Sequence, residues 1–310
     1  MKRKTGWLLA VLLVALSAVA DCGGSGSSST TVAWTGQLSD TTNDLYGITW
    51  SGTQFVAAGE DGTILTSPDG VTWTTSPSGT SYKLSGIALS STQSGTQFVA
   101  VGEDGTILTS PDGVTWTTSS SGSTSDLYGI TWSGTQFVAV GEAGIILTSP
   151  NGVTWTTSSS GTSYKLSGIA LSSTQSGTQF VAVGEAGTIL TSPNGVTWTT
   201  SSSGSTSDLY GITWSGTQFV AVGEAGTILT SPDGVTWTTR SSGTLFSLCG
   251  IAWSGTQFMA VGLNGTILTS ADGITWTTST SGTAGILYGI TWSGKQFVAV
   301  GESGTILTSP

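Results

Sequence analysis

Six glutamates are the residues of this sequence whose placement most suggests chemistry, because they recur at one position of a repeated segment. They are Glu60, Glu103, Glu142, Glu185, Glu224 and Glu302, with Asp61 and Asp104 beside two of them. A ring of carboxylates can bind Ca²⁺ or attract a cationic partner. The alternative is a set of solvated turn residues without a ligand, and a position repeated this faithfully favours that alternative.

Aromatic residues recur with the same regularity. A tyrosine stands near the start of the repeated segment at Tyr46, Tyr128, Tyr210 and Tyr288, and a tryptophan follows at Trp50, Trp132, Trp214, Trp253 and Trp292. Aromatic side chains can stack on sugar rings. Repetition at fixed positions favours packing between the repeated units instead, and Tyr82 and Tyr164 are expected to be more exposed than these.

The elements that must position these residues are seven copies of one segment. The copies begin at Leu45, Leu84, Leu127, Leu166, Leu209, Leu248 and Leu287. Each contains four short runs rich in β-branched and aromatic residues, which in the fifth copy are 209–214, 218–222, 227–230 and 235–239. Several runs are apolar at consecutive positions, which indicates strands covered on both faces. Four-strand units repeating about every 40–45 residues are typical of propeller blades.

Turn chemistry separates the runs. In Ser231-Pro232-Asp233-Gly234, proline presets φ, aspartate can bond the local backbone and glycine can take a left-handed conformation. Each copy therefore reads as a four-stranded antiparallel meander. The second and fourth copies are longer than the others, because four extra residues recur at Ser90–Gly95 and Ser172–Gly177, between the first two runs.

The two ends of the chain complement each other. The last copy stops at Pro310 without a fourth run, and an isolated fragment at Thr31–Thr35 resembles the fourth runs of the other copies. This N-terminal strand would complete the last blade and close the ring, which leaves no weak seam. The sequence therefore predicts an all-β protein, a seven-bladed β-propeller over residues 31–310. The glutamate turns would share one face with the connections between blades.

Departures from the repeat concentrate around the fifth and sixth blades. Arg240 and Phe246 lie in the connection between them, and Leu263 and Asn264 replace the acidic turn pair of the other blades. One hypothesis is a local apolar, less acidic patch that binds a partner or ligand. The other is sequence drift in a copy that was duplicated earlier.

The turn segments carry a family resemblance. Ser-Pro-Asp-Gly-Val-Thr-Trp occurs at Ser67–Trp73, Ser110–Trp116 and Ser231–Trp237, with asparagine at Asn151 and Asn194 and alanine at Ala271. It resembles the Asp-box (BNR) repeat of sialidase-like propellers, although Asp and Gly are adjacent here. The chain is also similar to photosystem II assembly factor-type propellers. The resemblance implies structural roles for the turn acids, which are Asp69, Asp112, Asp233 and Asp272.

The resemblance to sialidases does not extend to their catalytic residues. Sialidases use an arginine cluster, whereas Arg240 is the one arginine after residue 20. Glycosidases need two acids in contrasting environments. The acids here recur as equivalent sets, which disfavours a glycosidase site.

The first thirty residues read as a targeting region. Residues 1–20 combine Lys2, Arg3 and Lys4 with an apolar stretch and an Ala-x-Ala end, which predicts a secretory signal peptide. Residues 21–30 form a Gly/Ser-rich tether. Cys22 resembles a lipoprotein lipidation site, although Asp21 precedes it where a small residue is usual. Simple secretion, or a disulfide between Cys22 and Cys249, are the alternatives.

Composition narrows the function. The net charge is −10, there is no histidine, and three of the seven basic residues lie within residues 1–20. Nucleic acid binding, which needs clustered Lys and Arg, is therefore not expected. We expect a monomeric, bacterial, extracytoplasmic binding or scaffold propeller that presents loops to a protein or glycan, without catalysis, cofactor or metal. The alternatives are a carbohydrate-active enzyme or lectin, and an assembly factor for a membrane complex.

Overall fold

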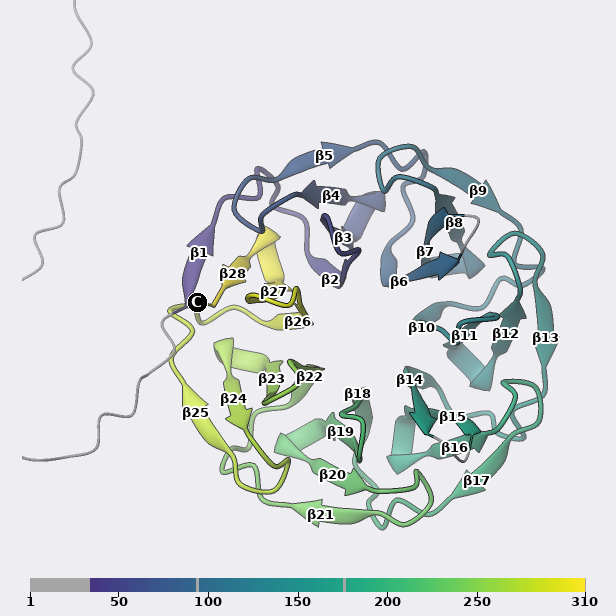
Figure 1. Ribbon diagram of the computed structural model, residues 1–310, viewed down its shortest axis with the longest axis vertical. Helices are drawn as coiled ribbons and strands as arrows, with labels where there is room; N and C mark the ends of the chain where they lie inside the picture. The colour runs from purple at the N-terminus through teal and green to yellow at the C-terminus, as the bar shows by residue number, and fades with distance from the viewer. Residues whose placement is uncertain (1–33, 93–94, 175–176, 310) are drawn as a thin grey trace, which may run out of the picture. The chain divides into compact units, whose positions relative to one another are not determined.

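The computed structural model describes residues 34–92, 95–174, 177–309, and these form a ring of seven four-stranded antiparallel sheets (Figure 1). This confirms the predicted seven-bladed β-propeller. In every blade the first strand lies nearest the centre of the ring and the fourth lies on the rim.

Blade 1 consists of β2 (Leu45–Trp50), β3 (Phe55–Gly59), β4 (Ile64–Ser67) and β5 (Thr74–Ser76); blade 2 of β6 (Leu84–Thr92), β7 (Gly95–Gly102), β8 (Ile107–Ser110) and β9 (Thr117–Ser119); blade 3 of β10 (Leu127–Trp132), β11 (Phe137–Gly141), β12 (Ile146–Ser149) and β13 (Thr156–Ser158). Blade 4 consists of β14 (Leu166–Thr174), β15 (Gly177–Gly184), β16 (Ile189–Ser192) and β17 (Thr199–Ser201); blade 5 of β18 (Leu209–Trp214), β19 (Phe219–Gly223), β20 (Ile228–Ser231) and β21 (Thr238–Arg240). Blade 6 consists of β22 (Leu248–Trp253), β23 (Phe258–Gly262), β24 (Ile267–Ser270) and β25 (Thr277–Ser279); blade 7 of β26 (Leu287–Trp292), β27 (Phe297–Gly301), β28 (Ile306–Thr308) and β1 (Thr35–Gln37).

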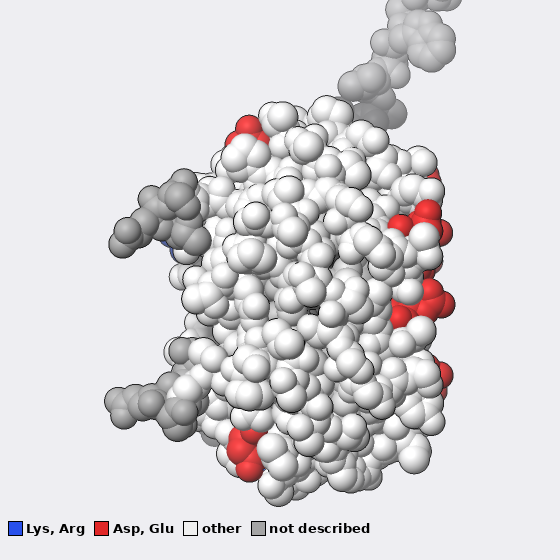
Figure 2. Space-filling model, turned by 90° about the vertical axis from the view of Figure 1, so that its right-hand side faces the viewer, with Lys and Arg blue, Asp and Glu red and all other residues white. Residues whose placement is uncertain are grey.

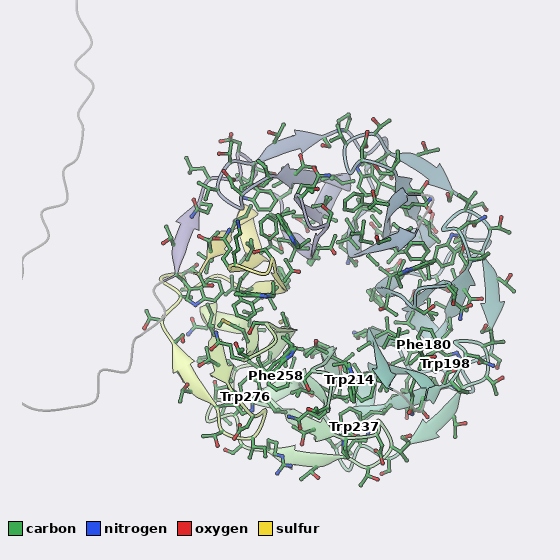
Figure 3. All side chains as sticks on the ribbon, viewed as in Figure 1. Phe180, Trp198, Trp214, Trp237, Phe258 and Trp276 are labelled. Atoms are coloured by element: carbon green, nitrogen blue, oxygen red, sulfur yellow. The ribbon has the colours of Figure 1, made fainter. Side chains whose placement is uncertain are left out.

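The core consists of seven apolar layers, each shared by two neighbouring blades. Between blades 1 and 2, Val56 and Ile64 pack against Leu84 and Phe98. The last five residues of every second strand are buried, as in β3 and β19, because this part of the strand is covered on both faces. Each layer also holds a phenylalanine–tryptophan pair, such as Phe258 with Trp276 at 6.3 Å between ring centroids (Figure 3). Both faces of each sheet are covered, as the consecutive apolar residues predicted.

The N-terminal strand closes the ring. β1 pairs with β28 in antiparallel register, and Gln37 Nε2 donates to Thr308 Oγ1 at 2.9 Å. Trp34 packs into the layer between blades 6 and 7. The pairing strand covers Thr35–Gln37, which differs from the predicted strand at residues 31–35. The reason is visible in blades 1 to 6, where the tryptophan and the residues before it belong to the turn and pairing begins after the tryptophan.

The same shift corrects the fourth strand of blade 5, which begins at Thr238 and not at Val235. Asp233 Oδ1 accepts hydrogen bonds from the N–H groups of Val235 at 2.9 Å and Thr236 at 2.8 Å. These donors are therefore engaged by the turn and cannot join the ladder. Trp237 Nε1 donates to Gly234 O at 2.9 Å, which fixes the tryptophan beneath the turn. The Asp turn is thus a capped structural unit.

The turn aspartates predict an acid-sensitive contribution to stability. Hydrogen bonds from backbone N–H groups, first that of Thr72, lower the pKa of Asp69, and the same kind of bond lowers the pKa of Asp112, Asp233 and Asp272. A lowered folded-state pKa stabilises the fold above the usual carboxyl pKa, and this contribution is lost as the pH falls through the folded-state value.

Replacing all four aspartates with asparagine should therefore flatten the dependence of urea stability on pH below about pH 4. Asn151 and Asn194 occupy the corresponding turns of blades 3 and 4 and accept the same backbone hydrogen bonds, so the fold should survive the change. An unchanged slope would show that the turn carboxylates contribute nothing to acid sensitivity.

Several predictions concern residues outside the described ranges. These are the signal peptide at 1–20, the tether at 21–30 and lipidation of Cys22. Cys249 has a free, half-buried thiol, and burial raises its pKa to about 11. Among the described residues, no helix has the length and apolar character needed to cross a membrane.

Candidate functional site

The glutamates lie in short 3₁₀ turns between the second and third strands. The turns are η1 (Glu60–Gly62), η2 (Glu103–Gly105), η3 (Glu142–Gly144), η4 (Glu185–Gly187), η5 (Glu224–Gly226), η6 (Leu263–Gly265) and η7 (Glu302–Gly304). The middle residue of each turn has a left-handed conformation, from Asp61 with φ of 49° to Asn264 with φ of 54°. The turns lie on the face where the innermost strands begin. In the side view, most of the acidic atoms in sight gather along one edge (Figure 2).

Most of these glutamates are tied to the backbone of their own blade. One carboxylate oxygen, Oε2, accepts the N–H of the residue just before the innermost strand. In blade 5 this bond runs from Asp208 N to Glu224 Oε2 at 3.4 Å, and in blade 7 from Ile286 N to Glu302 Oε2 at 3.1 Å. The other oxygen, Oε1, takes no part in this bond. The turn glutamates are therefore oriented groups whose second oxygen can accept from another donor.

Three aspartates that precede the innermost strands add to this ring of acids. They tie neighbouring blades together, because Oδ1 accepts the N–H of the left-handed turn residue in the preceding blade. Asp44 Oδ1 accepts from Ser303 N at 2.8 Å, and Asp208 Oδ1 accepts from Ala186 N at 2.9 Å. Asp126 makes the same bond with Asp104 N. Like the glutamates, these aspartates keep one oxygen for other partners.

Tyrosines from the innermost strands complete the arrangement. Tyr46 O–H donates to Glu60 Oε1 at 3.2 Å, and Tyr288 O–H donates to Asp44 Oδ2 at 3.3 Å. The rings of Tyr46 and Tyr288 lie 4.8 Å apart. Burial, followed by the charge of Asp126, raises the pKa of Tyr128 to about 12. These phenols therefore stay neutral and act as hydrogen-bond donors and aromatic surfaces.

We call this set the carboxylate–tyrosine ring. Its members are Asp44, Asp126, Asp208, the six turn glutamates, and Tyr46, Tyr128, Tyr210 and Tyr288.

Two lysines already use the tyrosine faces. Lys83 Nζ lies 5.5 Å from the ring centroid of Tyr46, and Lys165 Nζ lies 5.7 Å from that of Tyr128. In both cases the lysine comes from the next blade around the ring. An ammonium within about 6 Å of an aromatic face is attracted by its quadrupole, and nearby carboxylates add to this attraction. At these two positions the ring therefore holds an ammonium group of the protein itself.

Blade 6 breaks this pattern beside Tyr210. The residue that corresponds to Lys83 and Lys165 is Ser247, whose short hydroxyl instead accepts the N–H of Ala225 at 3.2 Å. Burial, then Asp208 and Glu224, raise the pKa of Tyr210. Tyr210 thus has the carboxylates of the other positions but no lysine of the protein over its ring.

The innermost strands surround a central channel. The innermost strands line it with a glycine and an isoleucine from each blade, such as Gly211 and Ile212, and Tyr46 joins them. Its volume is about 180 Å³. Among the described residues, no three His, Cys, Asp or Glu side chains come together in a way that could hold a metal ion.

The residues that break the repeat do not gather at one point. Arg240 lines a shallow groove with Leu245 and η5, and its Nε donates to Thr230 Oγ1 at 2.9 Å. Phe246 is 47 % exposed in the connection that follows. Leu263 and Asn264 form η6, and Leu263 N donates to Ser247 O. Leu263 therefore lies next to the open position at Tyr210, while Arg240 belongs to a separate groove.

Sequence reasoning found the glutamates but not their partners. Asp44, Lys83 and Tyr46 were not recognised as one group, because the contacts join residues of neighbouring blades. A signal was present: the position before each innermost strand alternates between aspartate and lysine over the first five blades, as Asp44, Lys83, Asp126, Lys165 and Asp208. Two residues further on, tyrosine alternates with serine in the same way. Each lysine therefore belongs to the blade that follows a tyrosine, and the two side chains can meet across the blade interface.

Comparison with known proteins gives the fold. No protein-family model matches the sequence, and no curated protein matches it. Among solved structures, YCF48 from Cyanidioschyzon merolae is similar with 19% identity and a TM-score of 0.70, covering 89% of this chain and 98% of that one. A structure of YCF48 bound to D1 peptide has 19% identity and a TM-score of 0.72 over 89% and 96% of the two chains.

Virginiamycin B lyase from Staphylococcus aureus is similar at 15% identity, with a TM-score of 0.78 over 89% of this chain and 99% of that one. The structurally similar proteins therefore include both a peptide-bound propeller and an enzyme. At these identities the likeness establishes the propeller fold and not an activity.

Proposed function

We propose that this protein is a non-enzymatic binding propeller whose carboxylate–tyrosine ring holds a basic segment of a partner protein. The observation that carries the proposal is the placement of Lys83 and Lys165 over Tyr46 and Tyr128. The protein's own lysines place an ammonium group over Tyr46 and over Tyr128, which supports the same arrangement at an equivalent tyrosine. The peptide bound to the structurally similar YCF48 supports a peptide as the partner.

Tyr210 is the position at which a partner's cation would enter. Its carboxylates, Asp208 and Glu224, are in place, and Ser247 leaves the face of the ring uncovered by a lysine. A lysine or arginine side chain of the partner would play here the part that Lys165 plays at Tyr128. The remaining acids of the ring would attract the rest of a basic segment over a longer range.

The test is binding of a tetralysine peptide, acetylated and amidated at its ends, to the full chain by calorimetry. We expect binding that weakens by about tenfold or more between about 50 mM and 500 mM salt, since the attraction is largely electrostatic. The Asp208→Asn, Glu224→Gln double variant should bind about tenfold more weakly, because both amides keep the backbone hydrogen bonds but lose the charge.

The matched control is the Asp233→Asn, Asp272→Asn double variant. It removes the same charge from turns on the opposite face and should bind as the wild-type chain does. Ser247→Lys supplies the lysine that blade 6 lacks, so it should also weaken binding. Equal binding by the wild type and the Asp208, Glu224 variant would contradict the proposal.

A membrane-complex assembly factor is the second candidate, and it rests on the likeness to YCF48. Co-purification of a membrane complex with the tagged chain from its native envelope would test it.

We also propose that the chain is an Asp-box propeller, because its capped Asp turns resemble that motif. We further propose that it lies outside the cytoplasm, on the pattern of residues 1–20. Intact mass of the secreted protein, with or without an acyl group on Cys22, tests that placement.

A further inference from the structure

A second site lies on the opposite face, where neighbouring blades meet. In blades 1, 3, 5 and 7 a glutamine in the turn of the first hairpin crosses to the Asp or Asn turn of the next blade. Gln54 Nε2 donates to Asp112 O at 2.5 Å and Gln218 Nε2 to Asp272 O at 2.7 Å. Gln136 and Gln296 make the same bond. This bond closes the groove between the two blades.

Blade 2 lacks this bond because its first hairpin is longer. The extra residues extend β6 and β7, so that Gln97 pairs with Ser90 inside the ladder. No hydrogen bond of the Gln97 side chain is found among the described residues, in contrast to its four counterparts. The groove between blades 2 and 3 therefore stays open, as a cavity of about 320 Å³.

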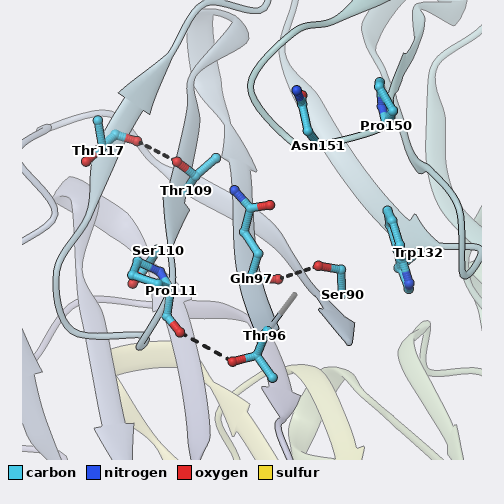
Figure 4. A pocket seen from close by; sticks show the side chains of 11 residues that line it. Ser90, Thr96, Gln97, Thr109, Ser110, Pro111, Thr117, Trp132, Pro150 and Asn151 are labelled. Carbon is cyan, nitrogen blue, oxygen red and sulfur yellow. Dashed lines mark hydrogen bonds between the residues drawn. The ribbon is translucent and has the colours of Figure 1, made fainter. Parts of the chain in front are cut away.

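The chemistry of this cavity is uncharged and mixed. Trp132, Pro150 and Asn151 of blade 3 lie on one side, and Gln97, Ser90 and Thr96 of blade 2 face them (Figure 4). Asn151 uses Oδ1 to accept the N–H groups of Val153 and Thr154, which leaves its Nδ2 to donate. Trp132 contributes a large apolar surface and is only partly buried.

We infer that this cavity binds a short segment of a neutral oligosaccharide. A complementary ligand needs an apolar face for Trp132, and hydroxyl groups for the amides of Gln97 and Asn151. It should carry no charge, since no lining side chain is charged. A sugar ring has these properties, with C–H bonds on its face and hydroxyls on its edge. The volume is at the lower end of the range usual for small-molecule sites, about 300–1,000 Å³.

The interface between blades 4 and 5 resembles this site in sequence. Gln179 and Trp214 repeat Gln97 and Trp132, but Asp233 stands in place of Asn151. Its carboxylate adds charge and lacks the amide donor. We therefore assign the neutral ligand to the cavity between blades 2 and 3. The variant Asn151→Asp places in this cavity the carboxylate that is found between blades 4 and 5, and it keeps the turn.

The experiment titrates the full chain with four probes: cellotetraose, maltotetraose, mannotetraose and the tetramer of N-acetylglucosamine. We expect at least one to bind with a Kd below about 10 mM and a stoichiometry of one. Trp132→Ala and Asn151→Asp should each weaken that binding by about tenfold. Trp253→Ala is the matched control, because Gln218 closes the groove beside it, and its affinity should not change.

Failure of all four probes to bind below that limit would overturn the inference, as would unchanged affinity in both cavity variants. If Trp132→Ala does not fold, Asn151→Asp alone decides the question, since aspartate occupies the same turn in blades 1, 2, 5 and 6. The inference does not depend on the basic-peptide site, which lies on the other face.

Discussion

Replacing Gly223 with alanine should destabilise the protein by at least about 3 kcal/mol, because a Cβ at this position has no room. It would lie 2.0 Å from the backbone oxygen of Asp208. The conformation of Gly223 is extended, so the obstacle is the close approach of two backbone segments and not the dihedral angles. The Asp208 oxygen also accepts the N–H of Glu224 at 2.8 Å, so it cannot move away without losing that bond.

Urea unfolding followed by tryptophan fluorescence measures this effect. The control is Gly36→Ala, because a Cβ on Gly36 would meet nothing within 4 Å. Its stability should stay within about 0.5 kcal/mol of the wild type. A Gly223→Ala protein that unfolds at the wild-type urea concentration would show that the turn and the inner strand are not fixed against each other. Asp208 and Glu224 would then not be held in place by the fold.

Deleting Trp34–Gln37 should have an effect of similar or larger size. The deletion removes the strand that pairs with β28 and exposes the Trp34 layer between blades 6 and 7. Loss of a fully buried tryptophan costs about 3–5 kcal/mol; Trp34 is partly buried, so its share is smaller and the lost β1–β28 pairing adds to it. The bared edge of β28 would also offer unpaired backbone groups to other chains, so we expect association as well as a lower melting temperature.

Calorimetry and light scattering on the truncated chain test this expectation. Removing residues 23–29 instead, which precede the strand, is the control and should leave the melting temperature unchanged. Trp34→Phe gives a finer comparison. Trp34 Nε1 is buried and has no hydrogen-bond partner among the residues that the structure describes, whereas Trp237 Nε1 donates to Gly234 O, so phenylalanine should be tolerated better at 34 than at 237. An unchanged melting temperature of the truncated chain would mean that β1 does not hold the ring closed.

The sequence was sufficient to predict the fold because each copy repeats the same local rules. The blade count, the ring closure and the burial of both sheet faces all came from the pattern of apolar residues and turns. The start of the fourth strand was predicted wrongly, since β-forming residues such as Val235 and Thr236 suggest a strand. Their N–H groups are bound by Asp233, and this bond depends on a side-chain orientation that composition does not reveal.

The candidate site was predictable only in part. Glu60 and its equivalents were identified from their repetition, whereas their bonds to the innermost strands follow from the three-dimensional turn. The pairing of Lys83 with Tyr46 joins two blades and depends on the spacing of the ring. Leu263 was noticed as a break in the repeat, and it lies beside Ser247. The departure from the repeat therefore pointed to the region where Tyr210 lacks a lysine, but not to Tyr210 itself.

The most direct test of the proposed function is a structure of the complex with the tetralysine peptide. We predict a lysine ammonium of the peptide within about 6 Å of the Tyr210 ring centroid, next to the carboxylates of Asp208 and Glu224. Lys83 and Lys165 should keep their places over Tyr46 and Tyr128. A peptide bound on the face of the Asp turns, or one that leaves Tyr210 uncovered, would contradict the assignment of the carboxylate–tyrosine ring as the binding site.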